Sequence, residues 1–256
     1  MKILVTGHKG FIGKNLTVEL VSDNHEVYTY EWGGAPPNVK GLDWVIHLGA
    51  ISSTTETNVR KILDQNVVFT IQLIEQCIEH NVNVQFASSA SIYGDTLHFK
   101  EDGPVNPLNH YARSKYLIEE YIKTRNAPIT IQAFRYFNVY GPNEEHKGSQ
   151  ASPYTQFTRQ AIQTGKIKVF KESDGCIRDF INVSEIIDLH KKFFSIKESG
   201  VWNFGTGETK SFLDVAKEVA EVYDAEIEEI PFPEYLKEHY QYYTCADLTK
   251  LKNTID

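Results

Sequence analysis

Residues 2–13 read KILVTGHKGFIG, and this stretch decides the fold. The apolar run Ile3–Thr6 predicts a short buried strand, and residues Asn15–Val21 after the glycines predict a helix. Gly7 permits a tight turn, Gly10 lets the backbone approach a pyrophosphate, and Gly13 lets the helix pack closely on the sheet. A strand, a glycine-rich turn and a helix in this order predict a phosphate-binding unit at the helix N-terminus.

Strand and helix patterns continue to alternate along the chain. The expected strands are Glu26–Tyr30, Trp44–Leu48, Val84–Ala87 and Ile129–Phe134, and the expected helices are Leu63–Glu79 and Tyr111–Lys123. Strands that alternate with helices predict parallel βαβ units with right-handed crossovers. From about Gly141 the pattern becomes irregular, and Phe212–Tyr223 predicts a further helix. We therefore expect an α/β fold with a doubly wound parallel sheet and a smaller C-terminal region over the carboxyl ends of the strands.

This pattern predicts two domains. Residues 1–140 plus about 181–204 form the expected dinucleotide-binding domain. Residues from about 141 to 180 plus 205–256 form the expected substrate domain, which we call the substrate-binding region.

The composition is that of an ordinary globular protein. Of 256 residues, 41% are hydrophobic and 23% are charged, which excludes a disordered chain, a collagen and a disulfide miniprotein. The formal net charge of −8 disfavours general nucleic-acid binding, because phosphate contact needs clustered Lys and Arg. We expect no nucleic-acid partner.

Three cysteines, Cys77, Cys176 and Cys245, are far apart and form no CxxC pair. They favour a reduced, cytoplasmic setting and no metal site. The first apolar run is far too short for a signal sequence, and no stretch approaches the ~18 apolar residues of a membrane span. We expect no membrane association.

Two residues give opposite indications about the cofactor. Glu31 ends the second predicted strand, where a carboxylate accepts hydrogen bonds from an adenosine ribose, which favours NAD. Lys9 lies inside the glycine loop, where its ammonium would neutralise a 2′-phosphate, which favours NADP. A carboxylate beside a phosphate is repulsive, so we expect NAD, with NADP as the alternative.

A serine cluster and a tyrosine–lysine pair supply candidate chemistry. Tyr111 and Lys115 stand four apart in a predicted helix, so both project from one face. A nearby ammonium lowers the pKa of a phenol, and we expect Lys115 to act on Tyr111 in this way. Residues 88–94, SSASIYG, follow a predicted strand, so their hydroxyls lie at its carboxyl end, within reach of a substrate oxygen.

Further segments complete a resemblance to a known family. They are HLGA at 47–50, Asn66, RYFNVYGP at 135–142 and RDF at 178–180. With the glycine loop and the Tyr–Lys pair, they resemble the extended short-chain dehydrogenase/reductase family, the NAD-dependent nucleotide-sugar epimerases and dehydratases. The resemblance implies a Rossmann-type fold, and it implies that the cofactor is bound by Gly7, Lys9, Gly10, Phe11, Ile12, Gly13, Glu31, Leu48, Gly49, Ala50, Asn66, Tyr111, Lys115 and Asn138.

Within the family, three stretches are most similar to the epimerases that invert carbon 6 of an ADP-linked heptose. They are SSTTE at 52–56, residues 134–152 with HKGS at 146–149, and residues 230–249. The resemblance makes Lys147 a second catalytic group beside Ser89, Tyr111 and Lys115. It implies a nucleotide-sugar substrate held by Ser52, Ser53, Thr54, Ser89, Asn138, Ser149, Phe170, Arg178 and Tyr240, with Arg178 on the diphosphate.

The implied chemistry is transient oxidation. Tyr111 would assist removal of a hydroxyl proton while hydride leaves carbon 6 for a bound nicotinamide. The carbonyl intermediate would then reorient, and hydride would return to its other face. Two orientations need two acid/base groups, which gives Lys147 a purpose distinct from Lys115. Family members often pair through helices matching Leu63–Glu79 and Tyr111–Lys123, so we expect a homo-oligomer, a dimer or larger.

Three other assignments compete with C6 epimerisation. A 4,6-dehydratase would carry an Asp-Glu pair where Ala90-Ser91 stands, so dehydration is disfavoured. A fucose-synthase-like epimerase/reductase shares the GHKG loop but uses a cysteine, and none of the three cysteines lies in the matching region. A cofactor-binding member without turnover is disfavoured because Ser89, Tyr111, Lys115 and Lys147 are all present.

Compared with the family, the chain is short at one place. Only eleven residues, 32–42, separate Glu31 from Asp43, and they include two prolines. A βαβ crossover needs at least ~10–12 residues, so a helix and a strand do not fit there. We predict that the usual second helix and third strand are missing, that the strand Glu26–Tyr30 is a sheet edge, and that the adenine pocket loses a wall. Relatives also run on into a further helical stretch after ADL at 246–248.

Overall fold

A parallel six-stranded sheet forms the centre of the computed structural model, which describes residues 1–33, 35–232 and 241–255. The strand order is β10-β5-β4-β3-β1-β2, and all neighbours run parallel. The strands are β1 (Lys2–Thr6), β2 (Glu26–Tyr30), β3 (Trp44–His47), β4 (Asn83–Ser89), β5 (Ile131–Tyr136) and β10 (Gly200–Phe204). This order, with chain reversal between β1 and β3, is the doubly wound arrangement expected from the sequence.

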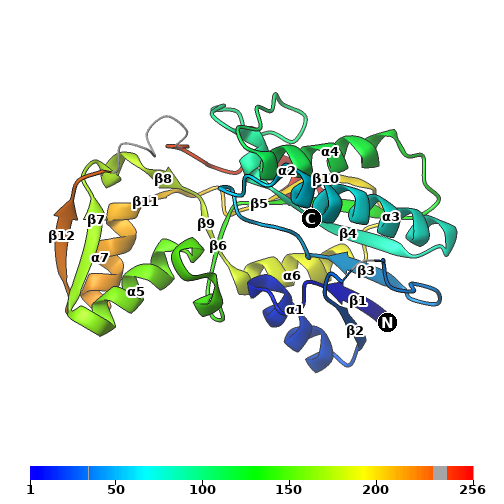
Figure 1. The fold of residues 1–256 in the computed structure, drawn as a ribbon, viewed down its shortest axis with the longest axis horizontal. Coiled ribbons are helices and arrows are strands. Elements are labelled where there is room, and N and C mark those ends of the chain that lie inside the picture. Colours follow the sequence, from blue (N-terminus) through cyan, green and yellow to red (C-terminus); the bar gives the residue numbers. More distant parts are fainter. Residues whose placement is uncertain (34, 233–240, 256) are drawn as a thin grey trace.

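Helices cover both faces of the sheet (Figure 1). One face carries α2 (Val59–Ile62), the π-helical turn η1 (Leu63–Val68), α3 (Phe69–Glu79) and α4 (His110–Thr124). The other face carries α1 (Phe11–Ser22) and α6 (Val183–Phe193). Because both faces are covered, β3 is buried along its whole length.

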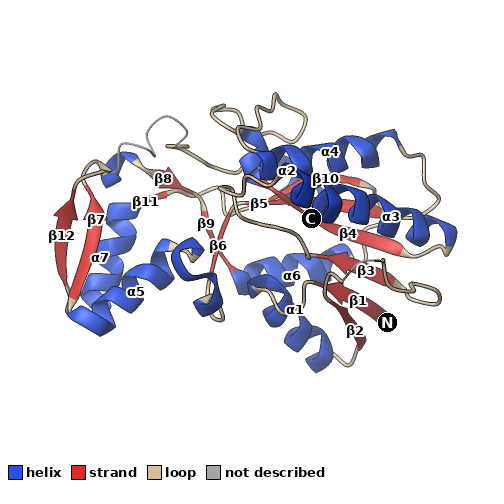
Figure 2. Ribbon diagram, viewed as in Figure 1, coloured by secondary structure: helices blue, strands red, loops and turns tan. Residues whose placement is uncertain are grey.

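A smaller lobe lies to one side of the sheet (Figure 2). It is built from α5 (Pro153–Thr164), β7 (Lys166–Phe170), α7 (Phe212–Tyr223) and β12 (Glu226–Ile230), which share one apolar cluster. Several short elements lie between this lobe and the sheet: β6 (Asn138–Tyr140), η3 (Glu145–Gln150), η4 (Ser173–Gly175), β8 (Ile177–Arg178), β9 (Phe180–Asn182) and β11 (Lys210–Ser211). A further short helix, η2 (Ala90–Tyr93), follows β4 and contacts α4. Helix α9 (Thr249–Ile255) ends the described chain and packs beside β10. The division into two domains stays a prediction.

The shortened segment confirms the predicted loss. Strand β2 is the end of the sheet and pairs only with β1, and the described residues between β2 and β3 form no helix or strand. Val39 from this segment is fully buried in the core, so the short connection still packs against the protein interior.

Several boundaries differ from the predicted ones. Helix α1 begins at Phe11, four residues early, because Gly10 is its N-cap. Strand β5 runs to Tyr136 rather than Phe134, because Arg135 stays buried by pairing with Glu119. The helix expected at Leu63–Glu79 begins at Val59, where the Asn58 side chain accepts a hydrogen bond from Lys61 N. The Phe212–Tyr223 helix has the predicted bounds.

Candidate active site

The glycine loop packs against the residues that follow β3. Gly7 has φ +72°, and a Cβ there would lie 2.6 Å from Gly49 N. A Cβ on Gly13 would lie 2.1 Å from Gly7 O. Both contacts are sterically impossible, so the two glycines are required for the turn and for the approach of α1 to the loop. Gly10, Phe11, Ile12 and Gly13 at the start of α1 line a cavity, and a helix N-terminus is a favourable place for an anion.

A cavity of about 270 Å³ lies in front of this loop. It brings together most of the residues predicted to bind the cofactor and three of the predicted catalytic residues. Its lining includes Gly7, Gly10, Phe11, Ile12, Gly13, Glu31, Leu48, Gly49, Ala50, Ser52, Tyr111, Lys115 and Lys147. Ala87, Ser88, Tyr136 and His146 line it as well. We call this the cofactor cavity.

Glu31 lies at the outer end of the cofactor cavity. Its carboxylate accepts a hydrogen bond of 2.7 Å from Lys9 N, and His8 Nδ1 lies 3.1 Å from the same oxygen. The carboxylate thus holds the glycine loop. The Lys9 side chain is exposed and is not among the described residues lining the cavity. The acidic side chain, rather than the lysine, therefore meets a ligand there, which favours NAD.

Tyr111 and Lys115 project from one face of α4 into the cavity, as predicted. Lys115 Nζ donates a hydrogen bond of 2.7 Å to Ala87 O and lies 5.8 Å from the Tyr111 ring centre. Burial lowers the pKa of Lys115 to about 7, and the nearby Glu119 carboxylate opposes this shift.

One expectation about this pair was wrong. We expected a lowered pKa for Tyr111, but its pKa is raised, because burial outweighs the opposing hydrogen bond with Ser89. The Tyr111 side chain is partly buried, and loss of solvent around the phenol favours its uncharged form. Tyr111 is therefore a neutral phenol at neutral pH in this structure.

Glu119 supports this part of the site and was not singled out from the sequence. It is fully buried one turn after Lys115, accepts from Ser88 Oγ at 2.5 Å, and forms a 2.6 Å ion pair with the buried Arg135. The position four residues after Lys115 was a signal, because i and i+4 share a helix face. The carboxylate links α4 to β4 and β5 beneath the cavity.

Lys147 reaches the cofactor cavity from η3. Its Nζ lies 5.1 Å from the centre of the Phe11 ring and 3.4 Å from Glu144 Oε1. The structure thus brings this lysine, far along the chain, to the same cavity as Tyr111. Its two neighbours are an aromatic ring at the start of α1 and a carboxylate on its own loop.

Glu144 was also missed from the sequence. It is fully buried, and its Oε2 accepts hydrogen bonds from Ser152 N at 3.1 Å, Ser152 Oγ at 2.6 Å and Thr155 Oγ1 at 2.7 Å. Ser152 is the N-cap of α5, so the carboxylate ties the Lys147 loop to this helix. The only sequence signal was a carboxylate three positions before the lysine.

Asn66 and Asn138 make contacts within the chain. Asn66 pairs with both backbone groups of Ile51 and donates to Ser114 Oγ, which fixes the loop after β3 to α4. Asn138 donates to Asp179 O and to Thr244 Oγ1. Both are suited to holding loops around the cavity, and their contacts to cofactor or substrate stay predictions.

The predicted substrate residues are more dispersed. Ser52 lines the cofactor cavity, and Ser53 Oγ accepts from Gln150 Nε2 at 2.8 Å, which joins its loop to η3. Ser89 caps η2, while Thr54 and Ser149 are exposed. Phe170 packs on Phe232, and the buried Arg178 donates to Ile177 O and Gln241 O. Tyr240 lies outside the described residues.

A second cavity, of about 250 Å³, continues past Glu31 to the end of β2. It is lined by Thr6, Gly7, Tyr30, Glu31, Trp32, Gly49, Ala50, Gln65 and Phe69. We call it the outer cavity. It shares Gly7, Glu31, Gly49 and Ala50 with the cofactor cavity, so the two cavities are adjacent.

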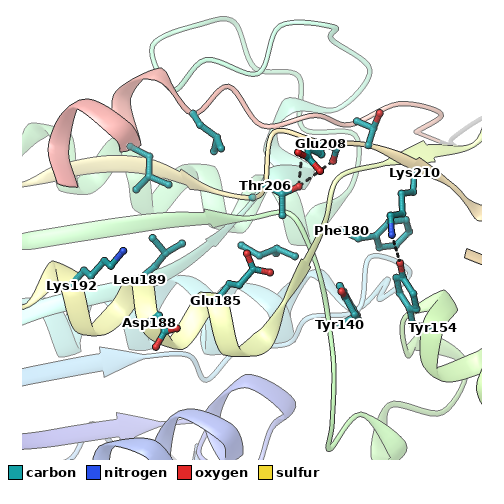
Figure 3. Close-up of a pocket in the computed structure, with 15 residues that line it drawn as sticks. Tyr140, Tyr154, Phe180, Glu185, Asp188, Leu189, Lys192, Thr206, Glu208 and Lys210 are labelled. Carbon is teal, nitrogen blue, oxygen red and sulfur yellow. Dashed lines mark hydrogen bonds between the residues drawn. The ribbon is translucent and has the colours of Figure 1, made fainter. Parts of the chain in front are cut away.

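A larger cavity, of about 640 Å³, lies between α6, β9 and the residues after β10 (Figure 3). Tyr140, Glu185, Leu189, Thr206 and Lys210 are among its lining residues. None of the residues predicted for the site lines it, so size alone does not identify the active site here.

Within the described residues, no group of three or more metal-ligating side chains is placed to hold an ion. The same part of the chain contains no helix that is long and apolar enough to cross a membrane.

The fold and cavity define a class of protein: a doubly wound nucleotide-binding fold in which a Tyr–Lys pair faces a glycine phosphate loop. The NAD dependent epimerase/dehydratase family matches residues 3–205. The chain belongs to this family.

Individual relatives narrow the comparison. A protein named ADP-L-glycero-D-manno-heptose-6-epimerase, from Brachyspira hyodysenteriae, is 34% identical over 98% of this chain and 90% of its own length. A solved UDP-N-acetylglucosamine 4-epimerase from Methanobrevibacter ruminantium matches with a TM-score of 0.89 at 22% identity, covering 100% of this chain and 91% of that chain. The solved ADP-L-glycero-D-manno-heptose-6-epimerase of Helicobacter pylori matches with a TM-score of 0.87 at 24% identity, covering 100% of this chain and 90% of that chain. The two structures support the fold.

Proposed function

We propose that this protein inverts carbon 6 of an ADP-linked heptose by transient oxidation and re-reduction with a bound nicotinamide cofactor. The observation that carries the proposal is that Tyr111, Lys115 and Lys147 line one cavity with the glycine loop. A redox epimerase needs an acid/base group for each of two sugar orientations, and this cavity offers two from different elements. The relative from Brachyspira hyodysenteriae supports the choice of sugar and nucleotide.

The residues present fit a dinucleotide. The glycine cradle has no room for a Cβ at Gly7 or Gly13, and the α1 N-terminus faces the cavity. When bound, the nicotinamide takes a hydride from the sugar and gives it back. Gly7–Gly13 would hold the pyrophosphate, Glu31 the adenosine ribose and Lys115 the nicotinamide ribose. We propose NAD, because the Glu31 carboxylate would repel a 2′-phosphate.

Tyr111 receives the sugar hydroxyl proton in one orientation. Its raised pKa keeps the phenol protonated at rest, so Tyr111 must first give its own proton to the uncharged Lys115 amine. The ammonium formed there then stabilises the phenolate, which accepts the hydroxyl proton as hydride leaves. Lys115 has a pKa of about 7, so it carries charge in part of the population at neutral pH. Ser89 would donate a hydrogen bond to the sugar oxygen as the carbonyl forms.

Lys147 serves the other orientation. It faces the cavity from the side of Phe11 and η3, whereas Tyr111 faces it from α4. A carbonyl intermediate that turns within the site therefore meets a proton donor on either side. Arg178, Ser149, Phe170 and Tyr240 would hold the nucleotide and sugar from a substrate domain made of residues from about 141 to 180 and 205–256, together with Asn138 from the dinucleotide-binding domain.

We also propose a cytoplasmic homo-oligomer. The three cysteines are few, lie far apart in the sequence and form no CxxC pair, which suits a reducing setting. Val59, Leu63, Val68 and Leu117 are each 40–48% exposed, and they lie on the neighbouring elements α2, η1 and α4. Clustered apolar side chains of this kind favour association through these helices.

The experiment that tests the function uses one pure C6 epimer of ADP-heptose and proton NMR. We expect the purified protein to convert it into a mixture of both epimers. Tyr111→Phe should lower the rate by about 10²-fold or more, because general acid–base catalysis contributes 10²–10⁴-fold. The variant should keep its cofactor. A fully active Tyr111→Phe enzyme would contradict the assigned role, and no conversion by the cofactor-loaded wild type would contradict the function.

A further inference from the structure

The short connection after β2 changes the outer cavity. The described residues between Trp32 and Leu42 contribute no strand beyond β2, so that side of the cavity has no sheet to close it. Trp32, the second residue after β2, lines the cavity instead. We propose that the Trp32 indole is the wall against which the adenine ring of the cofactor stacks, in place of the missing elements. The proposal rests on the cofactor assignment made above.

The loop that carries Trp32 is anchored. Tyr30 OH donates a hydrogen bond of 2.8 Å to Ala35 O, which fastens the residues after β2 across the end of their own strand. The Tyr30 ring stacks on Phe69, with centres 5.7 Å apart and an angle of 12° between the planes. The cavity therefore has an ordered aromatic floor, and Trp32 stands beside it.

The position matches the adenosine half of a dinucleotide. The outer cavity adjoins the cofactor cavity, and Gly7, Glu31, Gly49 and Ala50 line both. A pyrophosphate on the glycine loop, with its ribose on Glu31, directs the base past Glu31 into the outer cavity. Adenine is flat and apolar on both faces, and base–aromatic stacking is tolerant of geometry.

Exposure singles out this tryptophan. Trp32 is 49% exposed, whereas Trp44 and Trp202 are 2% and 0% exposed. An indole left half in water gains burial when a ring covers it, and the two core tryptophans are already covered. Because the chain has three tryptophans, a ligand that changes indole emission by direct contact must act through Trp32.

The test is a fluorescence titration of the full chain with AMP, ADP and nicotinamide mononucleotide. We expect AMP and ADP to quench the tryptophan emission and nicotinamide mononucleotide to leave it unchanged. Trp32→Phe should abolish the quenching. By calorimetry, Trp32→Ala should raise the Kd for NAD about 5- to 100-fold, the range for loss of one base–aromatic stack, and Trp32→Phe should raise it less.

A matched control is Tyr28→Ala, which removes an exposed aromatic ring from β2, the strand that precedes Trp32, at a residue that does not line the cavity. This variant should bind NAD as the wild type does. Quenching that persists in Trp32→Phe, or equal Kd values for Trp32→Ala and Tyr28→Ala, would overturn the proposal. Adenosine-dependent quenching in a protein that leaves ADP-heptose unchanged would support the role of Trp32 and contradict the proposed function, so the two failures are distinguishable.

Discussion

At the scale of single residues, Lys115 is a titratable group held in surroundings very different from water. It is buried, it donates to a backbone carbonyl, and its pKa is lowered from 10.5 to about 7. A lysine that loses its proton this readily is uncommon in a structural role and common where protons move. The same burial raises the pKa of Tyr111, so the pair is held in its less charged forms.

This burial predicts a pH dependence of stability. Between pH 7 and about 10 the unfolded Lys115 binds a proton that the folded one has released, so the free energy of unfolding contributed by this residue rises with pH. Below pH 7 both states are protonated and the full penalty of the buried charge remains. Urea unfolding at pH 6, 7.5 and 9 should show Lys115→Met more stable relative to wild type at pH 6 than at pH 9.

The matched control for this experiment is Lys123→Met, an exposed lysine on the same helix. Its stability relative to wild type should change little with pH. A wild-type curve parallel to that of Lys115→Met from pH 6 to 9 would contradict the burial of a titrating amine at position 115.

Tyr111, Lys115 and the glycine loop were predictable from the sequence because each follows a local rule, either a fixed spacing on a helix or a turn that only glycine allows. The direction of the Tyr111 pKa was not predictable. It depends on how much water the assembled site excludes, and neighbouring residues in the chain do not determine that.

At the scale of elements, the link between η3 and α5 controls where Lys147 lies. The buried Glu144 carboxylate joins the two by accepting three hydrogen bonds from Ser152 and Thr155, and it also faces Lys147. Sequence patterns missed this link because its partners are eight and eleven positions further along and become neighbours only when α5 begins at Pro153.

Glu144→Ala should therefore affect both stability and activity. It leaves buried donors on Ser152 and Thr155 unpaired, which costs about 1–3 kcal/mol per group left unsatisfied. The epimerase rate should fall because the Lys147 loop loses its attachment to α5. Chemical denaturation and the NMR assay measure the two effects.

Glu145→Ala is the matched comparison, since Glu145 is the adjacent carboxylate and is exposed. It should stay within about 0.5 kcal/mol of wild type and keep its activity. Equal stability of the two alanine variants would show that the Glu144 hydrogen bonds do not hold the loop.

The strands and helices of the sheet were largely predictable, because parallel strands buried on both faces are apolar throughout. The exceptions have physical causes. The predicted strand ended at Phe134, before the charged Arg135, but β5 continues through Arg135 because the Glu119 carboxylate pairs with this arginine inside the protein. The strands of the small lobe, β7 and β12, are not apolar throughout and pair across 60 residues of sequence, so their pairing was not predicted.

At the scale of the whole molecule, four exposed apolar side chains lie on α2, η1 and α4, helices that contact one another. They are Val59, Leu63, Val68 and Leu117, and we call them the apolar patch. Packing on the sheet explains the buried faces of these helices but does not explain why these four apolar residues are exposed. A helix face that packs on its own sheet and one that packs on a second subunit have the same apolar periodicity, so the sequence did not determine the oligomeric state.

The proposed homo-oligomer predicts a change in mass. Sedimentation of the wild type should give a dimer or larger species, and the double variant Leu63→Lys, Val68→Glu should give a monomer with the same fold by circular dichroism. Ile162→Lys, at a 67% exposed apolar residue on α5, should sediment as the wild type does. A monomeric wild type, or an oligomer that survives the double variant, would contradict association through this patch.

The central claim is that carbon 6 is inverted by removal and return of a hydride, so that the hydrogen never exchanges with solvent. The most direct measurement is to let the enzyme epimerise ADP-heptose in deuterium oxide and to examine carbon 6 of the product by NMR and mass spectrometry. For this mechanism we expect an inverted product that carries no deuterium at carbon 6, because the hydride that leaves carbon 6 is the one that returns. An inverted product with deuterium at carbon 6 would contradict it, since the inversion would then proceed by deprotonation of carbon.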